Sequence, residues 1–111
     1  MTSEQANQLL NQAHLYQQQL QSITIQKESL NLQHQEIINA LEELNKLKEN
    51  EVYKLVGPIL VKSDKAAMLK ELQEKKESIE MRMKTLERGE ARAKAQIEEL
   101  REKLSKLGTG G

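Results

Sequence analysis

The residues that could carry out chemistry are few and far apart in this sequence of 111 residues. His14 and His34 are the only histidines and there is no cysteine, which excludes thiol catalysis, disulfides and Cys-based zinc sites. On one helix the two histidines would lie roughly 30 Å apart, too far to bind the same metal ion. Gly57 is followed by Pro58 and begins no Gly-rich phosphate-binding loop. We therefore predict that the protein is not an enzyme and needs no metal or other cofactor.

The composition points to long helices rather than a compact core. Two tyrosines are the only aromatic residues, 31% of the residues are charged, and 17 Lys and Arg balance 17 Asp and Glu. This balance gives no reason to expect nucleic acid or a membrane surface as a partner. The sequence has no apolar run of membrane-spanning length, and its start is polar without a signal-peptide core. We expect a soluble cytoplasmic protein.

Apolar residues recur at alternating steps of four and three in both halves of the chain. A repeat of 3.5 residues over five heptads is typical of a left-handed coiled-coil seam. We expect helices over about residues 5–49 and 64–107, with Ser63 or Asp64 as the cap of the second helix and a flexible tail at 108–111. The predicted seam is Leu9, Ala13, Tyr16, Leu20, Ile23, Lys27, Leu30, His34, Ile37, Leu41, Leu44 and Lys48, then Leu69, Leu72, Lys76, Ile79, Met83, Leu86, Glu90, Ala93, Ile97, Leu100, Leu104 and Leu107.

A segment rich in β-branched residues lies between the two predicted helices. Gly57 followed by Pro58 fits a type II′ turn, so we predict a β-hairpin over residues 51–62; an irregular loop is the alternative. Two strands alone are marginal in water, and these are apolar on both faces. We therefore expect strands of other chains to cover them in an obligate oligomer. The residues assigned to this interface are Val52, Tyr53, Leu55, Val56, Gly57, Ile59, Leu60 and Val61.

A reversal of the chain at the turn would make the two helices an antiparallel hairpin. Seam positions whose residue numbers sum to about 116 or 117 would then face each other. In this register Lys27 and Glu90, charged residues at otherwise apolar seam positions, would meet. A buried charge pair of this kind can be tolerated and can fix the register. The same register places Leu44 opposite Leu72, Ile37 opposite Ile79, Leu30 opposite Leu86, Ile23 opposite Ala93 and Leu9 opposite Leu107.

Several apolar residues lie outside the seam, where a two-helix hairpin has no third layer to cover them. Near the free ends of the helices, fraying would expose an apolar surface suited to unselective contact with other apolar chains. The alternative, that these residues only complete the seam, is equally consistent with the sequence. This end surface would combine Leu10 and Leu15, which lie outside the seam, with seam residues: Leu9, Ala13, Tyr16, Ile97, Leu100, Leu104 and Leu107.

The order of helix, single β-hairpin and returning helix of equal length resembles the beta-type subunits of the prefoldin family. Residues 51–62 are similar to that family's hairpin, with a Val-Tyr-Lys strand, a Gly-centred turn and an apolar strand ending on Lys. Residues 16–20 and 40–44 are similar to its first helix, and residues 72–90 to its second. The resemblance thus covers essentially all of one domain, residues 1–111, although Gly89 departs from the family's more helix-favouring choice. A single hairpin rather than two favours the beta type.

The resemblance implies an ATP-independent chaperone with two alpha-type and four beta-type subunits, whose hairpins form β-barrels. The tips of the coiled coils would hold non-native polypeptides and deliver them to a group II chaperonin. The tips correspond to residues around 9–16 and 93–107, and Arg101, Lys103 and Lys106 are candidates for contacting the chaperonin. The alternatives are a structural coiled-coil tether without client binding and a regulatory module that binds one folded partner.

Overall fold

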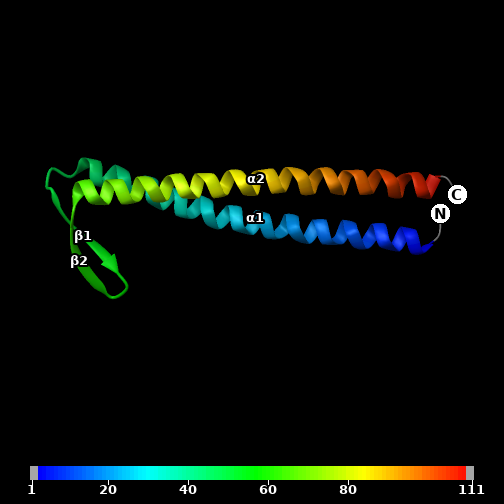
Figure 1. Ribbon diagram of the computed structural model, residues 1–111, viewed down its shortest axis with the longest axis horizontal. Helices are drawn as coiled ribbons and strands as arrows, with labels where there is room; N and C mark the ends of the chain where they lie inside the picture. Colours follow the sequence, from blue (N-terminus) through cyan, green and yellow to red (C-terminus); the bar gives the residue numbers. More distant parts are fainter. Residues whose placement is uncertain (1–2, 110–111) are drawn as a thin grey trace. The chain divides into compact units, whose positions relative to one another are not determined.

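Two helices joined by a β-hairpin make up the fold, as the sequence predicts. The computed structural model describes residues 3–109. Figure 1 shows the element order: α1 (Ser3–Lys46), β1 (Glu51–Val56), β2 (Ile59–Asp64) and α2 (Lys65–Thr109). Helix α1 ends three residues before the expected boundary at 49. Helix α2 continues through Gly108 and Thr109, which we expected in the tail, and the rest of that tail lies outside the described residues.

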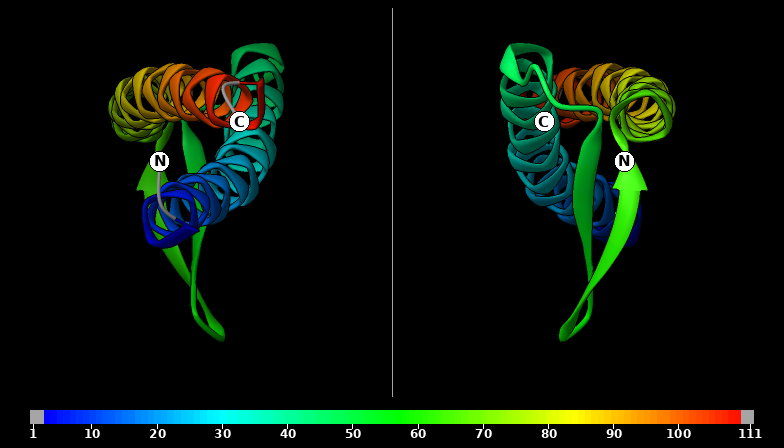
Figure 2. Two further views of the ribbon diagram at one scale, coloured as in Figure 1. Left: turned by 90° about the vertical axis from the view of Figure 1, so that its right-hand side faces the viewer. Right: turned by 90° about the vertical axis from the view of Figure 1, so that its left-hand side faces the viewer.

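The chain divides into two compact units, which are described separately. Unit 1 contains residues 1–28 and 83–111, and unit 2 contains residues 29–82. In unit 1 the first part of α1 packs along the last part of α2, and residues of both helices line shared grooves. Unit 2 contains the other part of each helix together with the β-hairpin. Figure 2 shows the hairpin of unit 2 as a twisted two-stranded ribbon.

The predicted seam residues within α1 and α2 are all buried or half-buried, whereas Lys48, beyond the end of α1, is exposed. Ala93 and Leu100 are buried in unit 1, and Leu30, Val52 and Ile79 in unit 2. Removing apolar surface from water contributes roughly 25 cal/mol per Å². The heptad pattern thus identifies the face of each helix that packs. Within residues 3–109, neither helix has an apolar stretch long enough to cross a membrane.

The junctions around the hairpin are held by specific hydrogen bonds. The Asp64 carboxylate accepts a hydrogen bond of 2.7 Å from the backbone N–H of Ala67, so Asp64 rather than Ser63 caps α2. The backbone N–H of Lys65 donates to the carbonyl of Asn50, and its Nζ donates to the carbonyl of Leu47, both at 2.7 Å. Lys65 therefore ties the start of α2 to the segment that follows α1.

The strands are antiparallel, and their register runs from Glu51 opposite Asp64 to Val56 opposite Ile59. Only Gly57 and Pro58 lie between them. Gly57 has φ +57°, and the ring of Pro58 fixes a negative φ, which together define the predicted type II′ turn. The second strand extends two residues beyond the expected end at Lys62.

Candidate interaction surfaces

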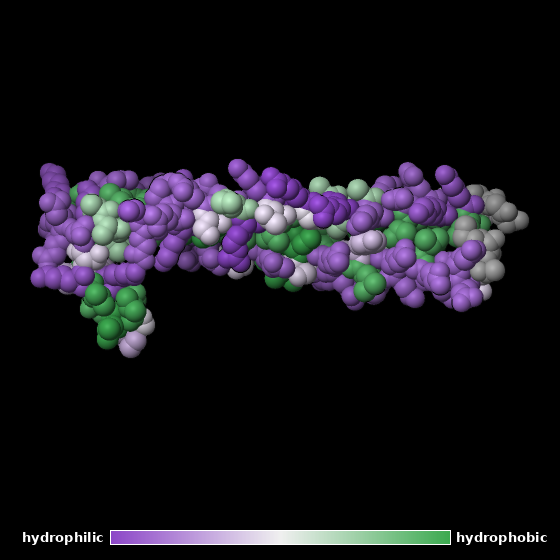
Figure 3. All heavy atoms as spheres, viewed as in Figure 1, coloured by the Kyte–Doolittle hydropathy of each residue, from purple (hydrophilic) through white to green (hydrophobic). Residues whose placement is uncertain are grey.

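The tip of the β-hairpin is an exposed apolar surface. Its large side chains are between 42% and 70% exposed, and Figure 3 shows apolar atoms gathered over it. Alternation along the strands puts Tyr53, Leu55 and Leu60 on one face and Val56, Ile59 and Val61 on the other. We call these six residues the hairpin surface. Because both faces are apolar, no single contact within the chain could cover them.

Val52, which we also assigned to the interface, lies at the base of the hairpin and is only 8% exposed. Beside it, the Nζ of Lys54 donates a hydrogen bond to Oε1 of Glu71 on α2. This bond, more than any other influence, lowers the pKa of the Glu71 carboxyl, and the charge of Lys75 at 3.8 Å acts in the same direction. The base of the hairpin is therefore fixed to α2 and its tip is free. Sequence reasoning did not predict this pair, because the contact depends on how the strand lies over the helix.

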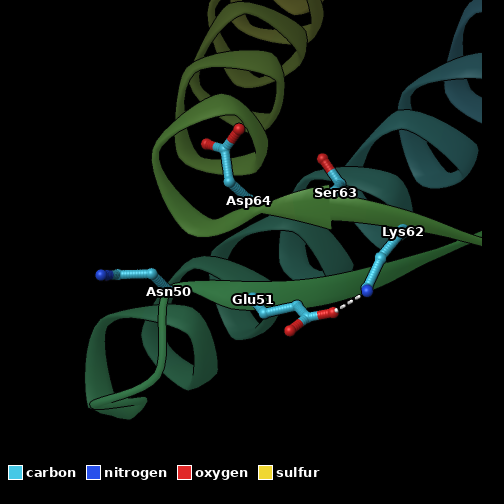
Figure 4. A pocket seen from close by; sticks show the side chains of 5 residues that line it. All are labelled: Asn50, Glu51, Lys62, Ser63 and Asp64. Atoms are coloured by element: carbon cyan, nitrogen blue, oxygen red, sulfur yellow. Dashed lines mark ion pairs between the residues drawn. The ribbon is translucent and has the colours of Figure 1, made fainter.

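An open surface cavity of about 440 Å³, lined by polar residues, lies at the end of the hairpin nearest the helices. Asn50, Glu51, Lys62, Ser63 and Asp64 line it, as Figure 4 shows. Glu51 and Lys62 form an ion pair of 2.8 Å, and Asp64 is occupied in capping α2. Since both carboxylates already have partners, this cavity offers no free charged group for a ligand.

The second apolar surface is a groove of about 230 Å³ near the free ends of the helices in unit 1. We call it the end groove. Leu10 is 53% exposed, and Leu15 on the same helix is 60% exposed. Leu100, which we assigned to a client-binding tip, is instead buried, and Leu9, Tyr16 and Leu107 are half-buried. The end groove is lined by Leu10, Ala13, His14 and Gln17 of α1 and by Ile97, Arg101 and Leu104 of α2.

The three basic residues assigned to chaperonin contact differ in their surroundings. Arg101 lines the end groove, with its Nη1 3.6 Å from Oε2 of Glu98. Lys103 forms an ion pair of 3.4 Å with Glu99, and Lys106 is exposed. The surroundings of the three residues therefore differ, and Arg101 belongs to the end groove.

The structure brings Lys27 and Glu90 together across the seam of unit 1. The Nζ of Lys27 donates to both carboxylate oxygens of Glu90 at 3.3 and 3.4 Å, and the two side chains are 24% and 23% exposed. The Nζ of Lys94 also lies near this carboxylate, 3.9 Å from Oε1 of Glu90. The neighbouring Gly89 lies against Ile23. This is the pairing that the register derived from the sequence requires.

A second polar contact crosses the seam in unit 2, at His34. Its Nε2 lies 3.4 Å from Oε1 of Glu80, and Lys76 reaches the same oxygen at 3.5 Å. The hydrogen bond with His34 is the main reason that the pKa of Glu80 is lowered, and the charge of Lys76 adds to it. Sequence reasoning placed His34 on the seam but missed Glu80, because Glu80 lies beside the seam. His14 is exposed on the wall of the end groove.

These features define a coiled-coil protein with an exposed β-hairpin, and comparisons with known proteins identify its family. The family described as prefoldin subunit matches residues 7–110. Prefoldin subunit beta of Thermococcus onnurineus is 44% identical over 101 residues, 90% of this chain and 87% of the relative. That of Archaeoglobus fulgidus is 42% identical over 104 residues, 93% and 90% of the two chains.

The solved structures agree with the sequence comparisons. The crystal structure of the prefoldin beta subunit from Thermococcus strain KS-1 matches with a TM-score of 0.85 and 36% identity, covering 93% of this chain and 91% of the other. The chain therefore belongs to the prefoldin family and is similar to its archaeal beta subunits, which confirms the resemblance seen in the sequence. It is thus a subunit of the chaperone class, in which no catalytic role is known.

Proposed function

We propose that this chain is a subunit of an ATP-independent holdase. It binds non-native polypeptides at the free ends of its helices and delivers them to a group II chaperonin. The observation that carries the proposal is the pair of separate apolar surfaces, with the hairpin surface in unit 2 and the exposed Leu10 and Leu15 in unit 1. One surface can serve assembly while the other remains available for clients.

The proposed assembly is a cytoplasmic hexamer with two alpha-type and four beta-type subunits, whose hairpins complete β-barrels. Support comes from the hairpin itself, whose two outer edges pair with no other strand and whose tip is exposed on both faces within the described residues. An uncovered two-stranded sheet is marginal in water. Strands from neighbouring subunits would satisfy its backbone groups and bury the six side chains of the hairpin surface.

The client-binding part is tested by replacing Leu10 and Leu15 together with Ser. Both side chains are exposed, so the substitutions should leave the helices folded. We expect weaker suppression of aggregation of a chemically unfolded client, with the native mass of the complex unchanged. The matched control replaces Ile25 and Leu32 with Ser, since these are 61% and 68% exposed but lie away from the free ends. Full activity in the Leu10 and Leu15 variant would refute this site, whereas an unmodified complex that does not suppress aggregation would favour the tether or adaptor function.

The assembly part is tested separately with Leu55→Asp and Ile59→Asp, one on each face of the hairpin. Either charge would be buried in the barrel without a partner, which costs several kcal/mol. We expect native mass spectrometry to show dissociated subunits. Leu32→Asp, at a helix position of similar exposure, should leave the hexamer intact. An unchanged native mass for both hairpin variants would refute the role of the hairpin.

A further inference from the structure

We propose that the end groove selects aliphatic client segments that carry a carboxylate beside the apolar side chain. This inference rests on the proposed function and specifies the kind of polypeptide that the tips prefer. Its basis is the division of the groove into an apolar part and a polar part without acidic residues. Leu10, Ala13, Ile97 and Leu104 supply the first, and His14, Gln17 and Arg101 supply the second.

The size of the groove limits what the apolar part can hold. A dry apolar cavity of about 150 Å³ holds one benzene ring, so a groove of about 230 Å³ accommodates one or two aliphatic side chains. It is open to solvent along the helices, since Leu10 is half exposed. An extended segment can therefore place one apolar side chain between α1 and α2 while its neighbours lie along the rim.

The polar part of the groove complements negative charge. A guanidinium is always charged and presents five N–H donors, and it binds a carboxylate with two parallel hydrogen bonds. The 3.6 Å separation of Arg101 from Glu98 exceeds hydrogen-bond distance, and both side chains are mostly exposed, so the donors of Arg101 remain available to a client.

The two other polar residues can assist Arg101. The side-chain amide of Gln17 and the ring N–H of His14 can each donate to the same anion. Among the seven residues that line the groove, none carries a carboxylate. A basic residue of a client would therefore meet Arg101 and no opposite charge on the walls of the groove.

The test uses three fluorescent peptides with one common Leu-rich core, flanked by Glu, Gln or Lys. Binding is measured on the assembled complex, in which only this chain is varied, at about 0.01 M salt, where charge interactions extend roughly 30 Å. We expect the Glu-flanked peptide to bind about two- to fivefold more tightly than the Gln-flanked one, as for other exposed charge pairs. The Lys-flanked peptide should bind most weakly. In about 1 M salt the preference should disappear.

Two matched variants assign the preference to the groove. Arg101→Gln removes the guanidinium from the groove and should abolish the preference, so that the Glu-flanked and Gln-flanked peptides bind this variant equally. Arg88→Gln is the same change at another exposed position of α2 in unit 1, outside the residues lining the groove, and should retain the preference.

The outcomes separate this inference from the proposed function. Equal binding of the three peptides by the unmodified complex would overturn the selectivity and leave the holdase function standing. A preference that survives Arg101→Gln would overturn the assignment to this groove. If the unmodified complex binds none of the peptides and does not suppress aggregation of an unfolded client, the proposed function itself fails.

Discussion

The Lys27–Glu90 pair offers the sharpest test of how the two helices are aligned. Replacing only Lys27 with Met leaves Glu90 largely buried with Lys94 at 3.9 Å as its remaining partner. Replacing only Glu90 with Met leaves the Lys27 ammonium on the seam, from which its flexible stem can carry it toward water. Replacing both with Met removes both charges and fills the same space with apolar atoms. We expect each single variant to be destabilised and the double variant to recover.

The exposure of the two side chains sets the expected magnitude. Exposed pairs contribute about 0.2–1 kcal/mol, whereas breaking a fully buried pair costs about 3–5 kcal/mol. With about a quarter of each side chain exposed, we expect each single substitution to lower the free energy of unfolding by about 1–2 kcal/mol. The double variant should be as stable as the original or slightly more stable, because replacing a buried pair with apolar residues removes its desolvation cost.

The assay is urea unfolding followed by circular dichroism, at one fixed protein concentration because assembly contributes to the apparent stability. The double-mutant cycle isolates the coupling between the two residues. A swapped variant, Lys27→Glu with Glu90→Lys, keeps both charges in the same register and should regain most of the stability lost in the singles. Strict additivity of the two Met substitutions, within about 0.3 kcal/mol, would refute an energetic role for the pair.

Three shorter predictions concern the turn, the weak point of α2 and the base of the hairpin. Gly57→Ala forces a side chain into φ +57° and should destabilise the hairpin by about 1–2 kcal/mol, seen as weaker subunit association in native mass spectrometry. Gly89→Ala should raise the free energy of unfolding by about 0.5–1 kcal/mol, because Ala favours the helix more than Gly does. The added methyl would meet Cδ1 of Ile23 at 3.4 Å, and a loss of stability would contradict the prediction. The hydrogen bond from Lys54 lowers the pKa of Glu71. Its contribution to the free energy of unfolding is therefore fully present above the ordinary glutamate pKa of about 4.3 and is lost as the pH falls through the lowered pKa of the folded state. Glu71→Gln should remove that acid-dependent part of the stability profile.

The seam could be predicted because one physical rule determines it. A spacing of 3.5 residues places every predicted seam position of α1 and α2 on the side that packs. The turn could be predicted for a similar reason, because Gly followed by Pro leaves few backbone conformations. The facing of Lys27 and Glu90 follows from these two facts, since the position of the turn fixes which residues meet.

The contacts that sequence reasoning missed lie beside these regular patterns. The Lys54–Glu71 hydrogen bond depends on the angle between a strand and a helix, which no heptad encodes. Glu80 meets His34 from a position next to the seam. Arg101 was grouped with Lys103 and Lys106 by charge alone, and only the packing of α1 shows that it shares a groove with Leu10. In each case the residue can be singled out in the sequence, but its partner is known only from the three-dimensional arrangement.

The seam and client-binding interpretations of the end residues are compatible, because few side chains of unit 1 are fully buried. Of the described residues there, only Ala93 and Leu100 are buried, and Ala93 contributes little area. Burying a Leu side chain contributes about 1.5–3 kcal/mol, so opening the ends as far as Leu100 costs several kcal/mol, because the half-buried Leu104 and Leu107 become exposed as well. We expect backbone amides of residues 3–16 and 100–109 to exchange with solvent faster than those of residues 23–27 and 86–90, and a bound client to slow them. Uniform protection along both helices would show that clients use only the permanently exposed Leu10 and Leu15.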